Sequence, residues 1–299
     1  MIDMHMHTTH SDGTDSTVEI LKNCNKANLE VISITDHNSV MAYYDLENID
    51  IKKYYQGKII TGCEFTINYN NNMIEVLGYG FDYKKINNYL KENCSPKQIN
   101  KNSKIMYKRL VSKIKELNLK FNEENIKITE DEFSKGIFGW QVWDELRKYN
   151  ENIKKINEDI WESYAKFFRN SLTNSKSILF VNYLEFRPSL NEIIDLIHEN
   201  GGLAFLAHPF QYKFCETKEL LNEIVNNYNI DGIECYHTTF DKEKMIFLEN
   251  YAKKHNLLIS GGSDYHGKNK INHNLGIGNN NLNINAKILE NRRINSLFY

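Results

Sequence analysis

Short motifs rich in histidine and carboxylate follow apolar, β-branched runs at several places in this 299-residue chain. The motifs are DMHMH at 3–7, SDG at 11–13, TDH at 35–37, GCE at 62–64, AHP at 207–209 and SDYH at 263–266. Each run is typical of a short buried strand. Imidazole and carboxylate groups delivered to the ends of several strands are what a multinuclear metal site requires.

The composition allows one catalytic domain with an added cap. Hydrophobic residues make up 41% of the chain and aromatic residues 12%, which is enough for a full core. The formal net charge is −2, so the whole molecule lacks the positive surplus that long nucleic acids select. This charge leaves small anionic substrates open, and we expect no long nucleic acid as a partner.

The sequence also bears on the cellular compartment. The five cysteines are odd in number and form no CxxC pair, which argues against both a disulfide framework and a thiolate zinc site. The first motif begins within a few residues of Met1 and leaves no room for a secretion signal. No run approaches the roughly 20 apolar residues of a membrane span. We expect a soluble, cytoplasmic protein that does not associate with membranes.

The apolar runs alternate with helical segments for most of the chain. Strands are predicted at 1–8, 31–35, 58–61, 203–207, 232–236 and 257–260, with a hairpin formed by 64–67 and 73–79 around the asparagines at 70–72. Ser16 and Glu19 form a predicted capping box for a helix that ends near Asn28. Ile193, Leu196 and Ile197 mark the buried face of a later helix. Repeated β-then-α units favour an α/β barrel or an open doubly wound sheet.

The segment 83–186 breaks this alternation and is predicted to be a helical insertion. Met106, Leu110, Ile114 and Leu117 form one stripe at helical spacing, and Lys97, Lys101, Lys104 and Lys108 form another. The basic stripe suits an anionic substrate, but a solvated helix face explains it equally well. Trp140, Trp143 and Arg147 also share helical spacing; core packing explains the two tryptophans, and substrate contact is the alternative.

Each motif taken alone has an ordinary structural explanation. His5 and His7 share one face of a strand, yet many such pairs are surface histidines. Asp36 with His37 fits a helix cap, and Pro209 by itself ends a strand. All of these explanations must hold independently for the metal hypothesis to fail. His198 and His255 lie in predicted helices and are expected to be structural or exposed, while His10, His237 and His273 fit the pattern less cleanly.

Taken together and in order, the motifs resemble the polymerase and histidinol phosphatase (PHP) family of metal-dependent phosphoesterases. The matching strings are DMHMHTTHSDG at 3–13, ITDHN at 34–38, GCE at 62–64, VLGYG at 76–80, GGLAFLAHPF at 201–210, DGIECYH at 231–237 and GGSDYHG at 261–267. The likeness covers roughly residues 1–82 and 187–280.

This resemblance implies a fold and a set of ligands. The fold would be a distorted seven-stranded (β/α) barrel of PHP type, formed by residues 1–82 and 187–299, with 83–186 as a mainly helical cap. It would hold up to three divalent ions, Mn²⁺, Fe²⁺ or Zn²⁺. By analogy with the family, the first ion would take His5, His7, Glu64 and Asp264, the second Glu64 and His208, and the third Asp12, His37 and His266.

The chain departs from the family at two places. Many relatives have histidine where this chain has Glu75, and a carboxylate there favours Mn²⁺ or Fe²⁺ over Zn²⁺. Relatives that act on nucleotides with 3′ and 5′ phosphates carry an Arg and His motif where this chain has GWQVW at 139–143. Their substrate therefore does not transfer to this chain.

The resemblance implies a mechanism in which two ions bridged by Glu64 bind a shared water and present it as hydroxide in line with phosphorus. As our own hypothesis, Asp264 accepts the proton of the water, and His237 or His266 donates one to the leaving oxygen. Asp36 would orient a ligand imidazole. Candidate substrate contacts are Trp140, Arg147, Arg169 and Arg187.

The leading hypothesis is hydrolysis of a phosphomonoester or short phosphodiester of a small molecule or nucleotide. One alternative is an exonuclease that acts on short single strands, which would bind them in a salt-sensitive way. A second is a metal-stabilised binding module without activity. A carbon–nitrogen amidohydrolase and a histidinol-phosphate phosphatase fit the motif order less well. The sequence does not indicate the oligomeric state.

Overall fold

The computed structural model describes residues 1–156 and 159–289, and the chain divides into two compact units. The first comprises Met1–Ile67, Ile74–Leu90 and the chain from Pro188 onward; the second comprises Asn68–Met73 and Lys91–Arg187. Residues 290–299 of the predicted barrel domain and 157–158 of the predicted insertion lie outside the described residues. The roles of barrel and cap stay predictions.

The first unit begins with a small parallel sheet. Its strands are β1 (Ile2–Asp3), β2 (Val31–Ile32) and β3 (Lys58–Ile59), paired in that order. The crossovers contain α1 (Thr17–Lys26) and α2 (Met41–Glu47), followed by a short 3₁₀ turn at Ile51–Lys53. The predicted capping box is confirmed: Ser16 caps α1 and Glu19 returns to the Ser16 backbone.

A second sheet contains five strands in the order β4-β5-β6-β7-β8. They are β4 (Gly62–Tyr69), β5 (Asn72–Tyr79), β6 (Leu203–Leu206), β7 (Gly232–His237) and β8 (Leu258–Gly262). The predicted hairpin is confirmed, and its turn places Asn70 and Asn71 at φ of 50° and 60°, a conformation that asparagine tolerates. β5 and β6 are antiparallel, while β6, β7 and β8 are parallel.

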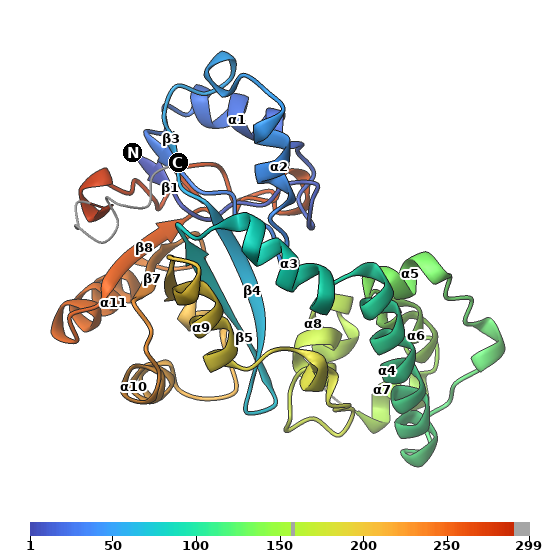
Figure 1. The fold of residues 1–299 in the computed structure, drawn as a ribbon. Coiled ribbons are helices and arrows are strands. Elements are labelled where there is room, and N and C mark those ends of the chain that lie inside the picture. The colour runs from blue at the N-terminus through green and yellow to red at the C-terminus, as the bar shows by residue number, and fades with distance from the viewer. Residues whose placement is uncertain (157–158, 290–299) are drawn as a thin grey trace. The chain divides into compact units, whose positions relative to one another are not determined.

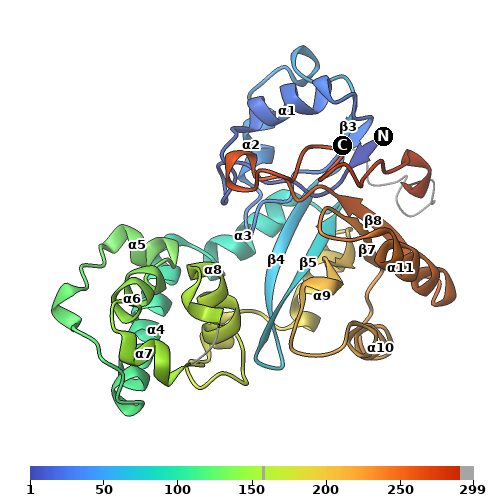
Figure 2. The same cartoon turned by 180° about the vertical axis from the view of Figure 1, so that it is seen from behind.

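Helices alternate with these later strands, as Figures 1 and 2 show. They are α3 (Tyr83–Asn93), α9 (Leu190–Glu199), α10 (Thr217–Asn227) and α11 (Lys242–Lys254), with 3₁₀ turns at Pro209–Gln211, Gly267–Asn269 and Ala286–Leu289. Ile193 and Ile197 are buried, as the predicted face of α9 requires, and Leu196 is partly buried. The α/β class is therefore confirmed.

The two sheets meet through short backbone contacts, not through a continuous ladder. Isolated parallel bridges join Met6 to Tyr265 and His37 to Glu64. The bridging hydrogen bonds include Asp264 N to His5 O at 2.8 Å and Asn38 N to Glu64 O at 2.9 Å. The described strands thus form two open sheets, and the closed seven-stranded barrel expected from the resemblance is not confirmed.

The second unit is helical and has its own core. Its helices are α4 (Pro96–Glu116), α5 (Glu130–Lys135), α6 (Gly139–Leu146), α7 (Asn150–Lys155) and α8 (Tyr164–Phe167), with a π turn at Phe168–Leu172 and 3₁₀ turns at Glu123–Asn125, Asp159–Trp161 and Tyr183–Phe186. Met106, Leu110 and Ile114 enter this core as predicted, and Leu117 packs against it. Trp143 is buried and donates its indole N–H to Ile160 O at 3.0 Å.

One core prediction in this unit is wrong. Trp140 is 49% exposed, because the α6 stripe that enters the core runs through Val142, Trp143 and Leu146, and Trp140 lies at its edge. Elsewhere, Cys24, Cys94 and Cys235 are free thiols. No helix within residues 1–156 and 159–289 has both the length and the apolar character needed to cross a membrane.

The contact between β8 and the chain after β1 leaves no room for a side chain at Gly262. A Cβ there would lie 2.4 Å from His5 N and 2.7 Å from Asp3 Oδ1. We expect Gly262→Ala to destabilise the metal-free protein by about 3 kcal/mol, the upper end of overpacking, because the obstacles include backbone. Urea unfolding measures this change in free energy.

Gly201→Ala is the control for this substitution. Gly201 has a φ of +84°, and a Cβ added there would meet no atom within 4 Å, so only backbone strain of about 1–2 kcal/mol applies. Equal destabilisation by the two substitutions would contradict the steric explanation.

Candidate metal centre

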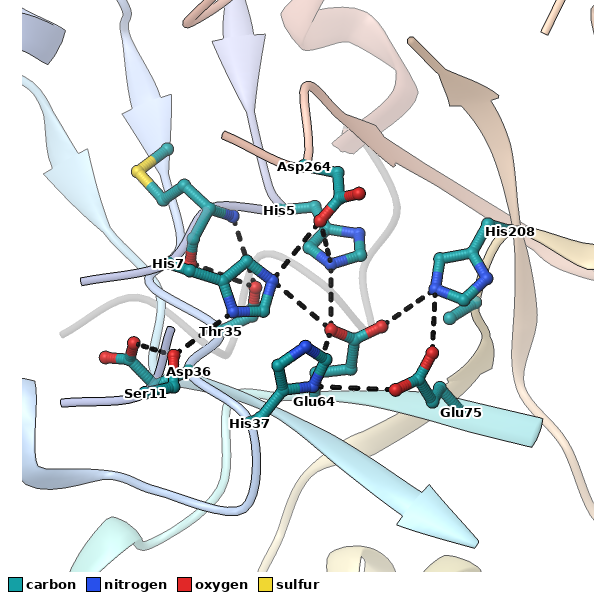
Figure 3. Close-up of polar contacts among 12 residues, drawn as sticks. His5, His7, Ser11, Thr35, Asp36, His37, Glu64, Glu75, His208 and Asp264 are labelled. Carbon is teal, nitrogen blue, oxygen red and sulfur yellow. Dashed lines mark hydrogen bonds and ion pairs between the residues drawn. The ribbon is translucent and has the colours of Figure 1, made fainter. Parts of the chain in front are cut away.

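The motif residues come together in one cluster within the first unit (Figure 3). His5 and His7 follow β1, His37 follows β2, His208 follows β6, and Asp264 and His266 follow β8. Glu64 and Glu75 differ from this pattern because they lie within β4 and β5, so the hairpin itself contributes both carboxylates. Asp12 lies in the loop between β1 and α1.

Glu64 is the centre of the cluster. Its Oε2 atom lies 3.1 Å from His5 Nε2, and 3.2 Å from both His7 Nε2 and His37 Nδ1. Its Oε1 atom lies 2.9 Å from His208 Nε2. The side chain is 1% exposed. One buried carboxylate therefore faces four imidazoles from three separate segments, which is the geometry of a bridging group.

Glu75 and Asp264 lie on opposite sides of Glu64. Glu75 Oε2 is 3.3 Å from His208 Nε2, and Glu75 Oε1 is 3.5 Å from His37 Nδ1. Asp264 Oδ1 is 3.4 Å from His7 Nε2 and 3.5 Å from His5 Nε2. These contacts separate the cluster into one part around Asp264 and another around Glu75.

Asp12 and His266 form a third part of the cluster. Asp12 Oδ1 lies 3.1 Å from His266 Nε2 and 3.9 Å from His37 Nε2. The rings of His7 and His266 stack with centroids 4.0 Å apart. Potential ligand atoms fall into three sets, in each of which all atoms lie within 4.8 Å of one another: His5, His7 and Asp264; His37, Glu64 and Glu75; and His7, Asp12, His37 and His266.

Several imidazole nitrogens in this cluster are buried without a hydrogen-bond partner. They are His7 Nε2, His37 Nδ1, His208 Nδ1 and His266 Nε2. Three of them have a carboxylate oxygen within 3.2 Å, but not at the angle that a hydrogen bond needs. Buried polar atoms are normally satisfied, and bound ions would satisfy the three nitrogens that lie beside carboxylate oxygens. His208 differs, because the nitrogen that faces Glu64 and Glu75 is Nε2. The residues present therefore fit divalent ions.

Two residues of the cluster have unusual backbone conformations. His208 has φ 24° and ψ 60°, and Asp264 has φ 54°, a region that residues other than glycine rarely adopt. Asn38, which follows His37, has φ 48°. Such strain persists only where surrounding contacts hold it, and it concentrates at functional sites.

Neighbouring positive charge holds the acidic groups ionised. Burial by itself raises the pKa of Glu64, but the positive charges of His5 and His37 outweigh it and hold that pKa well below the usual range. Burial likewise opposes ionisation of Asp264, and the charge of His5 and contact with His237 hold its pKa well below its usual value. The cluster is thus strongly anionic once its histidines are neutral.

The other carboxylate oxygen of Asp264 faces a different group of side chains. Oδ2 lies 2.7 Å from Lys270 Nζ and 3.3 Å from His237 Nε2. His273 Nδ1 is 3.6 Å from the same oxygen. The motifs of the sequence did not select Lys270; its only signal is its position six residues after Asp264 in the loop that follows β8.

The role predicted for Asp36 is indirect. Its Oδ1 accepts hydrogen bonds from Thr8 N at 2.7 Å and Ser11 Oγ at 2.6 Å. Ser11 Oγ in turn lies 3.4 Å from His7 Nδ1. Asp36 thus acts on His7 by fixing the loop that carries Ser11 (Figure 3).

The histidines outside the cluster have other partners. His198 Nε2 pairs with Asp231 at 2.6 Å, and His255 follows α11 and stacks on Tyr251. His10 pairs with Asp45 at 2.7 Å. These contacts agree with structural roles.

The candidate substrate contacts all belong to the second unit. Arg147 stacks over Trp143 at 4.5 Å and pairs with Asp144 at 2.8 Å. Arg169 is exposed and Arg187 is partly buried, while Trp140 is half exposed. Their contact with a substrate stays a prediction.

Comparison with known proteins places the chain among enzymes that cleave phosphoester bonds. The sequence profile described as PHP domain matches residues 3–242. The 5′-3′ exoribonuclease of Haemophilus influenzae is 25% identical over 270 residues, which cover 88% of this chain and 89% of that protein. The phosphoribosyl 1,2-cyclic phosphate 1,2-diphosphodiesterase of Eggerthella lenta is 31% identical over 105 residues, 35% of this chain and 36% of that protein.

Solved structures share the fold. A Bifidobacterium adolescentis protein described as a metal-dependent phosphoesterase has a TM-score of 0.62 and 22% identity, over 94% of this chain and 91% of that one. A Chromobacterium violaceum amidohydrolase, whose structure holds sulfate and no metal, has a TM-score of 0.63 and 17% identity, over 92% and 89% of the two chains.

Metal uptake should release protons. Burial lowers the pKa of His7 and His208, but nearby carboxylates outweigh it and raise these pKa values to about 9 and about 10. Both imidazoles are then charged at pH 7 in the metal-free protein, and a ligand imidazole must be neutral. We expect proton release on Mn²⁺ binding at pH 7, measured as binding heats that depend on the ionisation enthalpy of the buffer.

The same shifts predict how the metal-free protein responds to pH. The folded-state pKa values exceed the ordinary 6.5, so this contribution to stability is complete below about pH 6.5 and is lost as pH rises through about 9 to 10. Metal affinity should rise over the same interval. Buffer-independent heats together with an affinity that does not change with pH would contradict both expectations.

Proposed function

The chain belongs to the PHP domain family, and on this basis we propose that it is a metal-dependent hydrolase of phosphoester bonds in a small phosphorylated molecule, a nucleotide or a short RNA end. The observation that carries the proposal is the set of buried, unpartnered imidazole nitrogens beside carboxylates: His7 Nε2 and His37 Nδ1 at Glu64, and His266 Nε2 at Asp12. Free imidazoles and carboxylates at strand ends suit ion binding better than they suit a packed core.

The ligand assignment follows the three parts of the cluster. We assign His5, His7, Glu64 and Asp264 to a first ion and Asp12, His37 and His266 to a third. To a second ion we assign Glu64 and Glu75 together with His208, which lies in none of the three sets but meets both carboxylates through Nε2. When bound, the ions would lower the pKa of a water and offset charge on phosphoryl oxygens. The second set has two carboxylates and one imidazole, which favours Mn²⁺ or Fe²⁺ over Zn²⁺.

Hydrogen bonding separates the two candidate proton donors. His266 Nδ1 lies 2.8 Å from the carbonyl oxygen of Asp264, so that nitrogen carries the proton and Nε2 offers a lone pair. In His237 the two nitrogens have the opposite roles, because Nδ1 accepts a hydrogen bond from Thr239 N at 3.1 Å. His237 Nε2 then carries the proton and lies beside Asp264. We therefore assign proton donation to His237 and ligation to His266.

Lys270 places a positive charge beside this donor. Its ammonium group touches Asp264 Oδ2, the same oxygen that His237 faces. A phosphoryl group held beside Asp264 would meet both donors. Lys270 is thus suited to offset charge on the substrate, while Asp264 accepts a proton from the attacking water.

A leaving-group test separates proton donation from a structural role for His237. His237→Gln should lower kcat by about 10²–10⁴ for an alkyl phosphate, whose alkoxide needs a proton. p-Nitrophenyl phosphate should be affected far less, because nitrophenolate leaves without one. Steady-state rates with Mn²⁺ on both substrates measure the difference, and His255→Gln, away from the cluster, is the control.

Two outcomes of this assay would count against the proposal. Equal loss on both substrates would argue that His237 only supports the fold. If wild type and Asp264→Asn turn over no phosphoester, including 5′-phosphorylated oligoribonucleotides, the phosphoesterase proposal is wrong. Binding of ions without turnover would favour the metal-stabilised module, and cleavage of amide substrates would favour the amidohydrolase.

A second candidate, exonuclease activity, is favoured by the exoribonuclease that aligns along 88% of this chain. The α4 helix offers a basic face for the strand. Lys97, Lys101 and Lys108 are exposed, whereas Lys104 pairs with Glu130 at 2.7 Å. The three exposed lysines are therefore the part of the stripe available to a phosphate backbone.

Charge reversal tests this candidate. The triple variant Lys97→Glu, Lys101→Glu and Lys108→Glu should lower kcat/KM on a short 5′-phosphorylated oligoribonucleotide about 10-fold at low salt. Turnover of p-nitrophenyl phosphate should not change. Lys104→Ala is the matched control. If only the control loses RNA cleavage, or if both variants keep it, the three exposed lysines do not bind the RNA strand.

The remaining features are consistent with this proposal. Trp140, Arg147, Arg169 and Arg187 are proposed to contact the non-reacting part of the substrate. We also propose a cytoplasmic location, which the odd number of cysteines and the absence of a CxxC pair in the sequence support.

A further inference from the structure

Glu234 is a fully buried acidic residue in the middle of an apolar strand. It lies in β7 between Ile233 and Cys235, and all three side chains are 0% exposed. A carboxylate in such a place is strongly unfavourable unless its oxygens are paired. The groups that pair with the Glu234 oxygens therefore indicate its structural role.

Each oxygen of Glu234 holds a different proposed ligand. Oε1 lies 2.8 Å from His5 Nδ1. Oε2 accepts a hydrogen bond from the backbone N–H of His208 at 2.7 Å. These two ligands lie on separate loops, after β1 and after β6, so the carboxylate connects segments that are far apart in sequence.

The first contact decides which nitrogen of His5 carries the proton. An ionised carboxylate only accepts, so His5 Nδ1 must donate. The lone pair of His5 is then on Nε2, which lies 3.1 Å from Glu64 Oε2 and 3.5 Å from Asp264 Oδ1.

The second contact holds a strained backbone. His208 has φ 24° and ψ 60°, and its N–H has Glu234 as hydrogen-bond acceptor. This conformation directs the imidazole so that Nε2 lies 2.9 Å from Glu64 Oε1. Without the acceptor, the N–H would be buried and unpaired, and the backbone would relax toward an ordinary conformation.

We infer that Glu234 is a positioning residue for the metal centre, which sets the proton on His5 and the backbone of His208 so that both imidazoles present lone pairs to the ions. This inference rests on the proposed function, since it assumes that His5 and His208 are ligands. Carboxylates that orient ligand imidazoles commonly alter metal affinity by 10- to 100-fold.

The isosteric substitution Glu234→Gln is the sharpest probe, because an amide accepts at only one of its two ends. If the amide oxygen faces His208 N–H, the amide NH₂ faces His5 and forces the proton onto Nε2. If the oxygen faces His5, the NH₂ opposes the His208 N–H. Either orientation removes one lone pair or one backbone support, while volume and shape are kept.

The chain offers a matched control in the same unit. Asp231 Oδ2 pairs with His198 Nε2 at 2.6 Å and accepts from Ala204 N at 2.8 Å. It is therefore also a buried carboxylate that holds one imidazole and one backbone N–H. His198 is not one of the proposed ligands, so Asp231→Asn makes the same change from carboxylate to amide beside an imidazole without touching the metal centre.

The experiment measures Mn²⁺ binding to chelator-treated full-length protein by calorimetry and equilibrium dialysis. Glu234→Gln should bind the tightest ion roughly 10- to 100-fold more weakly than wild type. Asp231→Asn should bind it with wild-type affinity. If Glu234→Gln binds Mn²⁺ with wild-type affinity, or if Asp231→Asn loses as much Mn²⁺ affinity as Glu234→Gln, the inference about Glu234 is wrong while the proposed function stands. Absence of Mn²⁺ binding to wild type overturns the proposed function as well.

A second measurement does not depend on a variant that folds. Long-range ¹⁵N–¹H spectra of wild type loaded with Zn²⁺, which is diamagnetic, report the tautomer of each histidine. We expect His5 to be protonated on Nδ1. A proton on Nε2 of His5 overturns the inference whatever the variants do.

Discussion

Four buried carboxylates in the first unit need hydrogen-bond donors or cations around them, and the arrangement of the neighbouring chain depends on this need. Asp3, Glu64, Glu234 and Asp264 are each at most 4% exposed. Charges removed from water in this way are stable only where donors or cations surround them. The neighbouring loops supply those donors, and the irregular backbone around the cluster follows from that requirement.

The partners of these carboxylates differ in kind. Asp3 accepts backbone N–H groups, from Ser263 at 2.9 Å, Gly276 at 2.8 Å and His5 at 3.3 Å. Glu234 divides its oxygens between an imidazole and a backbone N–H. Glu64 faces imidazoles with both of its oxygens. From Asp3 through Glu234 to Glu64, fewer carboxylate oxygens bond to the backbone, and more of them face the imidazoles of the proposed metal centre.

Much of the site was predictable because ligand residues fall at strand ends. His5 and His7 are two residues apart and face the same cluster, as period-two geometry requires. The capping box of α1 and the asparagine turn of the hairpin are equally local, and the sequence predicted both correctly. Local patterns succeed where a short stretch of chain contains both partners of an interaction.

Interactions between distant segments were not predictable in this way. Glu234 meets His5 across 229 residues, and that meeting depends on the register of strands that no local pattern reveals. Strand lengths failed for a related reason. The predicted strand 1–8 is reduced to Ile2–Asp3, since beyond it backbone groups bond to the loops after β2 and β8, as Thr35 N does to Met6 O. Trp140 was wrongly predicted to be buried, because helical spacing does not define where the edges of a buried stripe lie.

The β4–β5 hairpin gives the centre a rigid side and an adjustable side. Glu64 and Glu75 are fixed in paired strands, whereas His208 and Asp264 lie on loops whose backbones already depart from regular geometry. Ions of different radius would therefore be accommodated mainly by the loops. Exchange of one metal for another should therefore leave Glu64 and Glu75 in place and displace the loops that carry His208 and Asp264.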